Sequence, residues 1–162
     1  SRFIPAEMAQ IKAGKVPAYL LEAVNKVAPG WQLADCGTDM DPGLRAEWGG
    51  RKNVLVTHPL DESTGCVLSK NIKVPAGKKT KLRLVVGHDP QGDFDLIVRA
   101  NGQELLRKPV SKATATNDPW LVQEVDLSAF AGKKAPTIEL INQPSGWSFE
   151  AAYWAEVAVV SE

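Results

Sequence analysis

The chain has 162 residues, a length that suits one domain with some additions. Its 19 basic and 19 acidic side chains cancel, which argues against a nucleic-acid partner or an anionic membrane surface, because both favour a basic patch. No apolar run approaches the roughly 20 residues that span a bilayer, so we expect no membrane partner either.

Residues 1–30 are predicted to form a short helical extension made of two helices. Pro5 suits the first turn of one helix, and Gly14 suits its end. The second helix is expected to begin at Pro17 and to end at Pro29–Gly30. Each helix has one apolar face: Ile4, Met8 and Ile11 in the first, and Val16, Leu20, Val24 and Val27 in the second. Both faces suit packing on the main domain, and an amphipathic pair that binds a partner is the alternative.

Residues 31–52 show no clear hydrophobic period and are predicted to be an irregular loop rich in Asp and Gly. The run 35–43, Asp-Cys-Gly-Thr-Asp-Met-Asp-Pro-Gly, is typical of turns. Its carboxylates could also ligate a structural calcium, which takes several oxygens from a flexible loop. The spacing does not fit an EF-hand, so a solvated turn is the first expectation.

Residues 53–162 have the pattern of short strands separated by Gly/Pro turns, which indicates an all-β sandwich. In residues 79–86 the polar and apolar side chains alternate, and Asn101-Gly102 is a strong hairpin signal. Eight strands suit a jelly roll: Asn53–Thr57, Cys66–Val74, Lys79–Val86, Asp93–Ala100, Gln103–Lys108, Leu121–Leu127, Thr137–Asn142 and Phe149–Val160. The predicted core consists of Leu82, Leu84, Phe94, Leu96, Val98, Val125, Ile138 and Leu140.

The string Val125-Asp-Leu-Ser-Ala-Phe-Ala-Gly-Lys133, followed by Thr137-Ile-Glu-Leu, resembles a motif of galactose-binding-like jelly-roll domains, which include many carbohydrate-binding modules. The segment 147–156 is similar to their closing strand. The runs 88–94 and 142–147 resemble uncharacterised modules of large secreted bacterial proteins. The resemblance covers roughly residues 53–162. It implies a jelly roll, a glycan or polysaccharide ligand, a secreted or periplasmic location and, in some members, a structural calcium.

Cys36 and Cys66 are the two cysteines of the chain, and they are too far apart for a CxxC redox or zinc motif. We expect a disulfide between them, in keeping with the secreted character of the resemblance. The alternative is two unrelated buried thiols.

In an all-antiparallel sandwich, alternate connections fall at the same end. The connections after strands one, three, five and seven are rich in polar and aromatic residues, and the others are short: the rich ones are 57–65, 87–92, 110–120 and 143–148. Loops positioned by a rigid scaffold often carry binding groups. The candidate ligand-binding residues are therefore His58, His88, Asp89, Gln91, Asn142, Gln143 and Trp147, with Trp147 stacking on a sugar ring and the others bonding its hydroxyls.

Several alternatives remain open for these residues. His58, His88 and Asp89 would suit a metal, although no HxH or HExxH spacing is present, and the two histidines could instead bond within the loops. Trp147 and Trp120 could cover the core. No GxSxG, Walker or GxGxxG motif occurs, so we expect no enzyme. The sequence favours a non-catalytic carbohydrate-binding module of a larger secreted protein, and the alternative is a structural module that docks other domains of that chain.

Overall fold

The computed structural model describes residues 16–162, so the first of the two expected helices, with Ile4, Met8 and Ile11, lies outside them. The second helix is present as α2 (Ala18–Val27). Pro17, with φ near −60°, stands immediately before it, and Ala28 ends it by donating its N–H to Val24 O. Leu20, Ala23 and Val24 of α2 are buried. No helix among the described residues is long and apolar enough to cross a membrane.

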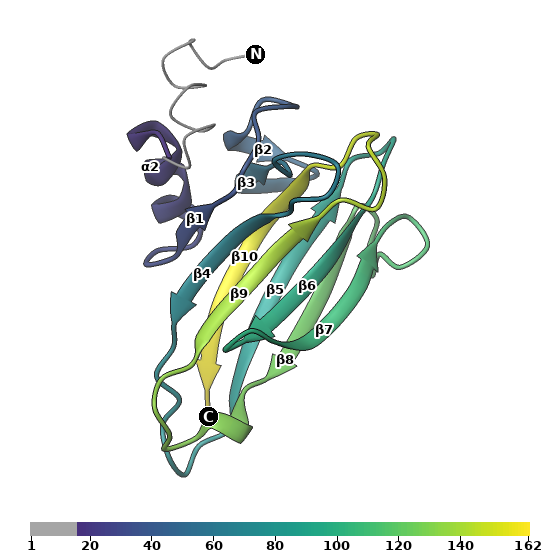
Figure 1. The fold of residues 1–162 in the computed structure, drawn as a ribbon. Helices are drawn as coiled ribbons and strands as arrows, with labels where there is room; N and C mark the ends of the chain where they lie inside the picture. Colours follow the sequence, from purple (N-terminus) through teal and green to yellow (C-terminus); the bar gives the residue numbers. More distant parts are fainter. Residues whose placement is uncertain (1–15) are drawn as a thin grey trace.

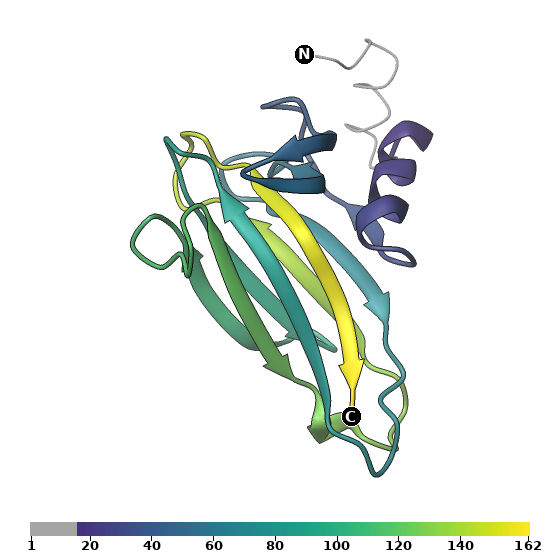
Figure 2. The same ribbon diagram turned by 180° about the vertical axis from the view of Figure 1, so that it is seen from behind.

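The rest of the described chain forms a sandwich of two antiparallel five-stranded sheets (Figures 1 and 2). The front sheet of Figure 1 has the order β1-β4-β9-β6-β7, and the back sheet has the order β2-β3-β10-β5-β8. The front strands are β1 (Gln32–Ala34), β4 (Cys66–Asn71), β9 (Thr137–Gln143), β6 (Phe94–Ala100) and β7 (Gln103–Val110). The back strands are β2 (Gly43–Trp48), β3 (Arg51–Thr57), β10 (Ala152–Ser161), β5 (Thr80–His88) and β8 (Trp120–Asp126), and a short helical turn, η1 (Ser128–Phe130), follows β8.

The core between the sheets is the one that the alternation predicts. All eight predicted core residues are buried in a single cluster, which also includes residues of α2. The expected hairpin joins β6 to β7, and both of its turn residues have positive φ, 50° for Asn101 and 79° for Gly102. This conformation is the one that a two-residue hairpin requires, and Asn and Gly adopt it at low cost. The prediction of an all-β jelly-roll sandwich with a short N-terminal helical extension is confirmed, with one helix of that extension among the described residues.

The expectation of an irregular loop over residues 31–52 is wrong, because β1 and β2 lie within it. β1 has only three residues, paired with β4, and β2 forms a hairpin with β3 through Gly49–Gly50. In the sequence of β2 the apolar Leu44, Ala46 and Trp48 alternate with Arg45 and Glu47, a five-residue signal that the sequence analysis overlooked beside the Asp/Gly-rich turn. The last strand also begins later than expected, since Phe149 has a positive φ and the strand begins at Ala152.

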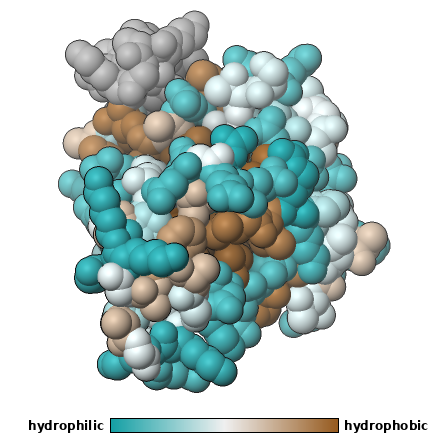
Figure 3. Space-filling view, turned by 60° about the horizontal axis from the view of Figure 1, so that its bottom comes forward, coloured by the Kyte–Doolittle hydropathy of each residue, from teal (hydrophilic) through white to brown (hydrophobic). Residues whose placement is uncertain are grey.

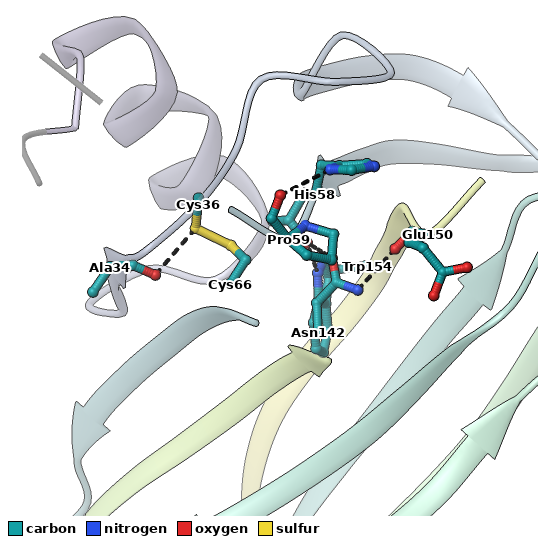
Figure 4. Close-up of a disulfide and its surroundings, with 9 residues drawn as sticks. Ala34, Cys36, His58, Pro59, Cys66, Asn142, Glu150 and Trp154 are labelled. Carbon is teal, nitrogen blue, oxygen red and sulfur yellow. Dashed lines mark hydrogen bonds between the residues drawn. A yellow bond between two sulfur atoms is a disulfide. The ribbon is translucent and has the colours of Figure 1, made fainter. Parts of the chain in front are cut away.

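Cys36 and Cys66 form the expected disulfide, and residues 16–162 contain no free cysteine. The bond joins the segment after β1 to the first residue of β4 (Figure 4). Cys36 Sγ lies 3.3 Å from the carbonyl oxygen of Ala34. A disulfide sulfur carries no hydrogen, so this is a van der Waals contact and the bond itself holds the segment in place.

Replacing both cysteines by serine should lower the free energy of unfolding by roughly 3–4 kcal/mol, because the disulfide closes a loop of 30 residues in the unfolded chain. Urea denaturation of the oxidised protein and of the double variant measures the difference. A loss below about 1 kcal/mol would contradict a stabilising role for the bond.

Candidate functional site

The four rich loops lie together at the upper end of the sandwich in Figure 1, and side chains connect them. Gln143 Nε2 donates to Ser63 O at 3.3 Å, which joins the end of β9 to the β3–β4 loop. His88 Nε2 lies 2.6 Å from Asp118 Oδ1, which joins the end of β5 to the β7–β8 loop. Ser145 hydrogen-bonds to Asp93 of the β5–β6 loop. These four segments are called the loop end below.

Asn142 lies beneath the loop end with no exposed surface. Its Oδ1 accepts a hydrogen bond from Thr57 Oγ1 at 3.0 Å, and its Nδ2 donates to Glu150 O at 3.0 Å. Trp154 Nε1 in turn donates to Thr57 Oγ1 at 3.0 Å. The network therefore joins β3, β9 and β10 (Figure 4). Asn142 is part of the core structure and does not present its side chain to solvent.

The carboxylate of Glu150 holds the β9–β10 loop from below. Its Oε1 accepts the backbone N–H of Ser145 at 2.6 Å and that of Gly146 at 3.1 Å, and the side chain is almost fully buried. The Ser145 hydroxyl lies within hydrogen-bonding distance of both Glu150 and Asp93, and its single hydrogen serves one carboxylate at a time. The loop that carries Trp147 is thus braced by two backbone hydrogen bonds to a buried group.

His58 is also buried, with 4% of its surface exposed. Its Nδ1 lies 2.9 Å from the carbonyl oxygen of Pro59, which requires a hydrogen on Nδ1. Its ring meets the Trp147 ring edge to face, with centroids 5.2 Å apart. Burial lowers the pKa of His58 below 6.5, against the opposing effects of the Pro59 hydrogen bond and of the Asp39 and Glu150 charges. His58 therefore supports Trp147 from behind.

His88 is 2% exposed, and all of its polar contacts are within the loops. Nδ1 lies 2.7 Å from Asp89 O and 3.0 Å from Gly92 O, and Nε2 faces Asp118. Both ring nitrogens are therefore engaged by the protein. For both histidines the structure shows bonding within the loops, which was one of the alternatives left open by the sequence.

The other sequence-predicted residues reach the surface to different extents. Gln91 is exposed, whereas Asp89 and Gln143 are partly buried. Asp89 Oδ1 accepts the N–H of Gln91 at 2.9 Å, and its Oδ2 accepts the Tyr153 hydroxyl at 3.2 Å. Trp147 has 41% of its surface exposed. The accessible part of the predicted site is therefore Trp147, Gln91 and the outer parts of Asp89 and Gln143.

Phe149 is a functional candidate that the sequence analysis missed. It is 44% exposed and lies two residues after Trp147. Its φ is +55°, a region that bulky side chains rarely adopt and that is concentrated at functional sites. Gly92 permits this arrangement, because a Cβ at Gly92 would lie 2.2 Å from Phe149 O. The alternating pattern assigned Phe149 to the last strand, so no local signal distinguished it.

Trp120 is buried and belongs to a second apolar cluster, which is separate from the core between the sheets. Its Nε1 donates to Gly49 O at 2.8 Å, and its ring meets Trp48 edge to face. Trp48 stacks on Tyr153 with centroids 3.7 Å apart. Burial and the Asp89 carboxylate raise the pKa of Tyr153 above its ordinary value. This cluster packs the β2–β3 hairpin against β5, β8 and β10 and leaves Trp120 inaccessible.

The described residues contain no group of three or more His, Cys, Asp or Glu side chains that could hold a metal ion. His58, His88 and Asp89 do not form such a group, so the structure gives no support to a metal centre built from them. The carboxylates of the segment 35–43 do not gather into one either.

No protein-family model matches the chain, and comparison with curated protein sequences finds no match. Solved structures do match. The K1 and K3 cleaved adhesin domains of Lys-gingipain from Porphyromonas gingivalis W83 each have a TM-score of 0.57 and 13% identity. The K1 match covers 86% of this chain and 95% of that domain, and the K3 match covers 84% of this chain and 94% of that domain. The CBM22-1 xylan-binding domain from Paenibacillus barcinonensis Xyn10C has a TM-score of 0.53 and 12% identity, over 86% of this chain and 90% of that domain.

The chain has the jelly-roll fold of carbohydrate-binding modules. At this level of identity the likeness concerns the fold, and function has to be argued from the surface of this protein.

Replacing Asn142 by leucine should lower the free energy of unfolding by about 2–4 kcal/mol, because it leaves the Thr57 hydroxyl and the Glu150 carbonyl without partners in a buried place. Chemical denaturation measures the loss. Gln143→Leu is the matched control, since Gln143 is only partly buried and makes one long hydrogen bond. Equal losses in the two variants would contradict the importance of the buried network.

The pKa of His58 should lie below 6.5 in an NMR titration of the ring. As the pH falls, His58 in the unfolded chain takes up a proton at a higher pH than His58 in the folded protein, and this stabilises the unfolded state. The contribution of His58 to folding stability is therefore present above pH 6.5 and is lost as the pH falls through the pKa of the folded state. His58→Gln should therefore unfold with less dependence on pH between about 7.5 and 5.5. An unchanged pH dependence would show that His58 titrates alike in both states.

Proposed function

We propose that the protein is a non-catalytic carbohydrate-binding module whose loop end contacts a glycan. The observation that carries the proposal is the exposed Trp147 ring on a loop held rigid from below. Aromatic rings bind the apolar face of a sugar with large area and little loss of conformational entropy. Because the loop is braced by Glu150 and the ring by His58, little further ordering is needed on binding.

Other groups of the loop end also suit a sugar. Phe149 adds a second exposed ring, and Gln91 and Asp89 add amide and carboxylate groups that can exchange hydrogen bonds with hydroxyls. His58, His88 and Asn142 act from within by holding these groups in place. The proposed contact residues are therefore Trp147, Phe149, Gln91, Asp89 and Gln143. One or two stacked rings and a few exchanged hydrogen bonds imply weak binding.

A docking module is the second candidate, and a specific observation favours it. Leu60, like Trp147 and Phe149, is an exposed apolar residue of the loop end, and exposed apolar side chains suit a protein partner. The adhesin domains of Lys-gingipain share this fold, and so does a xylan-binding domain. Under this alternative the loop end would bind other domains of a larger chain.

The disulfide supports a secreted or periplasmic location, because such bonds persist in oxidising compartments. A structural calcium, which the family resemblance implies for some members, is tested by including calcium and a chelator in the binding experiment.

Trp147→Ala should abolish glycan binding without lowering the melting temperature, because the ring stands on a loop outside the core. A glycan array with and without calcium identifies the ligand, and quenching of tryptophan fluorescence measures its affinity. Phe149→Ala should weaken binding. Leu105→Ala is the control, since Leu105 is an exposed apolar residue of β7 outside the loop end.

Binding that survives Trp147→Ala would contradict the proposed site. If no glycan binds, and Leu60→Ala and Trp147→Ala instead weaken association with a neighbouring domain, the docking module is the correct function.

A further inference from the structure

A pocket lies on the outer face of the front sheet, apart from the loop end. It has a volume of about 170 Å³ and is lined by Gly30, Gln32, Ser69, Lys70, Asn71 and Thr137. It lies where the turn after α2 meets β1, β4 and the first residue of β9, at the left of the sheet in Figure 1. A hollow of this size suits a small ligand of about one sugar ring.

The register of the strands explains why these side chains meet. Gln32 pairs with Ser69, and Asn71 pairs with Thr137, so the four lie close together on neighbouring strands. Gly30 completes the wall. Its φ is +87°, and a Cβ there would lie 3.1 Å from Lys70 Nζ. The glycine therefore leaves room for the ammonium group beside the pocket.

The lining is rich in hydrogen-bonding groups that the protein does not use. Thr137 Oγ1 donates to Asn71 Oδ1 at 2.8 Å, which orients the amide and leaves Asn71 Nδ2 as a donor. Within residues 16–162, the side chains of Gln32 and Ser69 make no hydrogen bond to the protein. The pocket thus offers two amides and a hydroxyl to a ligand.

Lys70 lies between Ser69 and Asn71 and pairs with the core residue Ile138, so its side chain leaves β4 on the opposite face and reaches the edge of the pocket at Pro29 and Gly30. The charge at this edge is positive. Lys70 Nζ has one long contact, 3.5 Å to Pro29 O, and no carboxylate of the described chain lies within ion-pair distance of it. Glu139 pairs with Ser69 in register but neither lines the pocket nor pairs with Lys70. An ammonium group with no counter-ion beside free hydrogen-bond donors is suited to an anionic, hydroxylated ligand.

The outer face of the sheet beside the pocket carries apolar residues. Val67, Ile141 and Ile97 are successive partners across β4, β9 and β6, and they alternate with core residues, so they face outward. Figure 3 tilts the molecule so that the bottom of Figure 1 comes forward, and shows hydrophobic residues gathered in the middle of the surface with hydrophilic residues around them. Ile97 and Ile141 are only 1% and 4% exposed, so this apolar strip is covered by the protein and a ligand is confined to the polar pocket.

We propose that this pocket is a second binding site, independent of the loop end, for a monosaccharide-sized hydroxylated carboxylate. The Lys70 ammonium binds the carboxylate, and Gln32, Ser69 and Asn71 bind hydroxyls. This chemistry is shared by a cyclic uronic acid and an open-chain sugar acid.

NMR titration of the 162-residue protein tests the site, with D-glucuronate, D-gluconate and neutral D-glucose as probes. At least one acid should give saturable shifts of the Gln32, Ser69 and Asn71 amide signals, and glucose should bind at least about tenfold more weakly. Lys70→Gln should weaken binding of the acid by about tenfold or more, because it removes the positive charge. Asn71→Asp should weaken it by a similar factor, because the variant keeps an acceptor for Thr137 but adds a negative charge. Lys73→Gln, an exposed lysine outside the lining, is the control and should bind normally.

Trp147→Ala separates this proposal from the proposed function, because it removes loop-end binding and should leave these shifts unchanged. Preference for glucuronate or for gluconate supports the site and assigns a cyclic or an open-chain ligand. The proposal is overturned if neither acid gives saturable shifts, if glucose binds equally well, if Lys73→Gln weakens binding as much as Lys70→Gln, or if Trp147→Ala abolishes the shifts.

Discussion

Asn142 lies at the open end of the sandwich core without any exposed surface, so its amide has to be satisfied by protein groups. Thr57 of β3 supplies the donor, the Glu150 carbonyl supplies the acceptor, and Trp154 of β10 donates to the same Thr57 hydroxyl. This network closes the core at the loop end and crosses from one sheet to the other. The geometry of the β9–β10 loop depends on it, because that loop runs between Asn142 and Glu150.

The loop end therefore has an inner and an outer layer. The inner layer consists of polar groups whose hydrogen bonds are made within the protein: Asn142, Glu150, His58 and His88. The outer layer consists of the exposed rings of Trp147 and Phe149 with the polar side chains beside them. A binding surface of this kind can be rigid although it is built from loops, because buried hydrogen bonds fix the backbone that carries it.

The additions before β3 have a structural role of their own. The disulfide ties the segment after β1 to β4, while α2 packs on the core and the β2–β3 hairpin covers part of the back sheet through Trp48. These additions also form one wall of the pocket on the front sheet, because Gly30 lies in the turn after α2 and Gln32 is the first residue of β1. β1 is too short to be recognised from its sequence, whereas residues 44–48 of β2 do alternate between apolar and charged side chains, and this signal was overlooked beside the Asp/Gly-rich turn.

Local sequence was enough for features that depend on nearest neighbours. Alternation along β5 and β6 determined which side chains enter the core, Asn101-Gly102 determined a tight hairpin, and antiparallel order placed four rich loops at one end. Local sequence could not say which loop side chains face solvent. His88 is buried against Asp118, 30 residues away, and Asn142 is buried against Thr57, 85 residues away. Phe149 reaches the surface because Gly92 admits its strained backbone. Burial of a polar side chain depends on partners that only the tertiary structure brings together, because a histidine or asparagine leaves water only where such partners replace it.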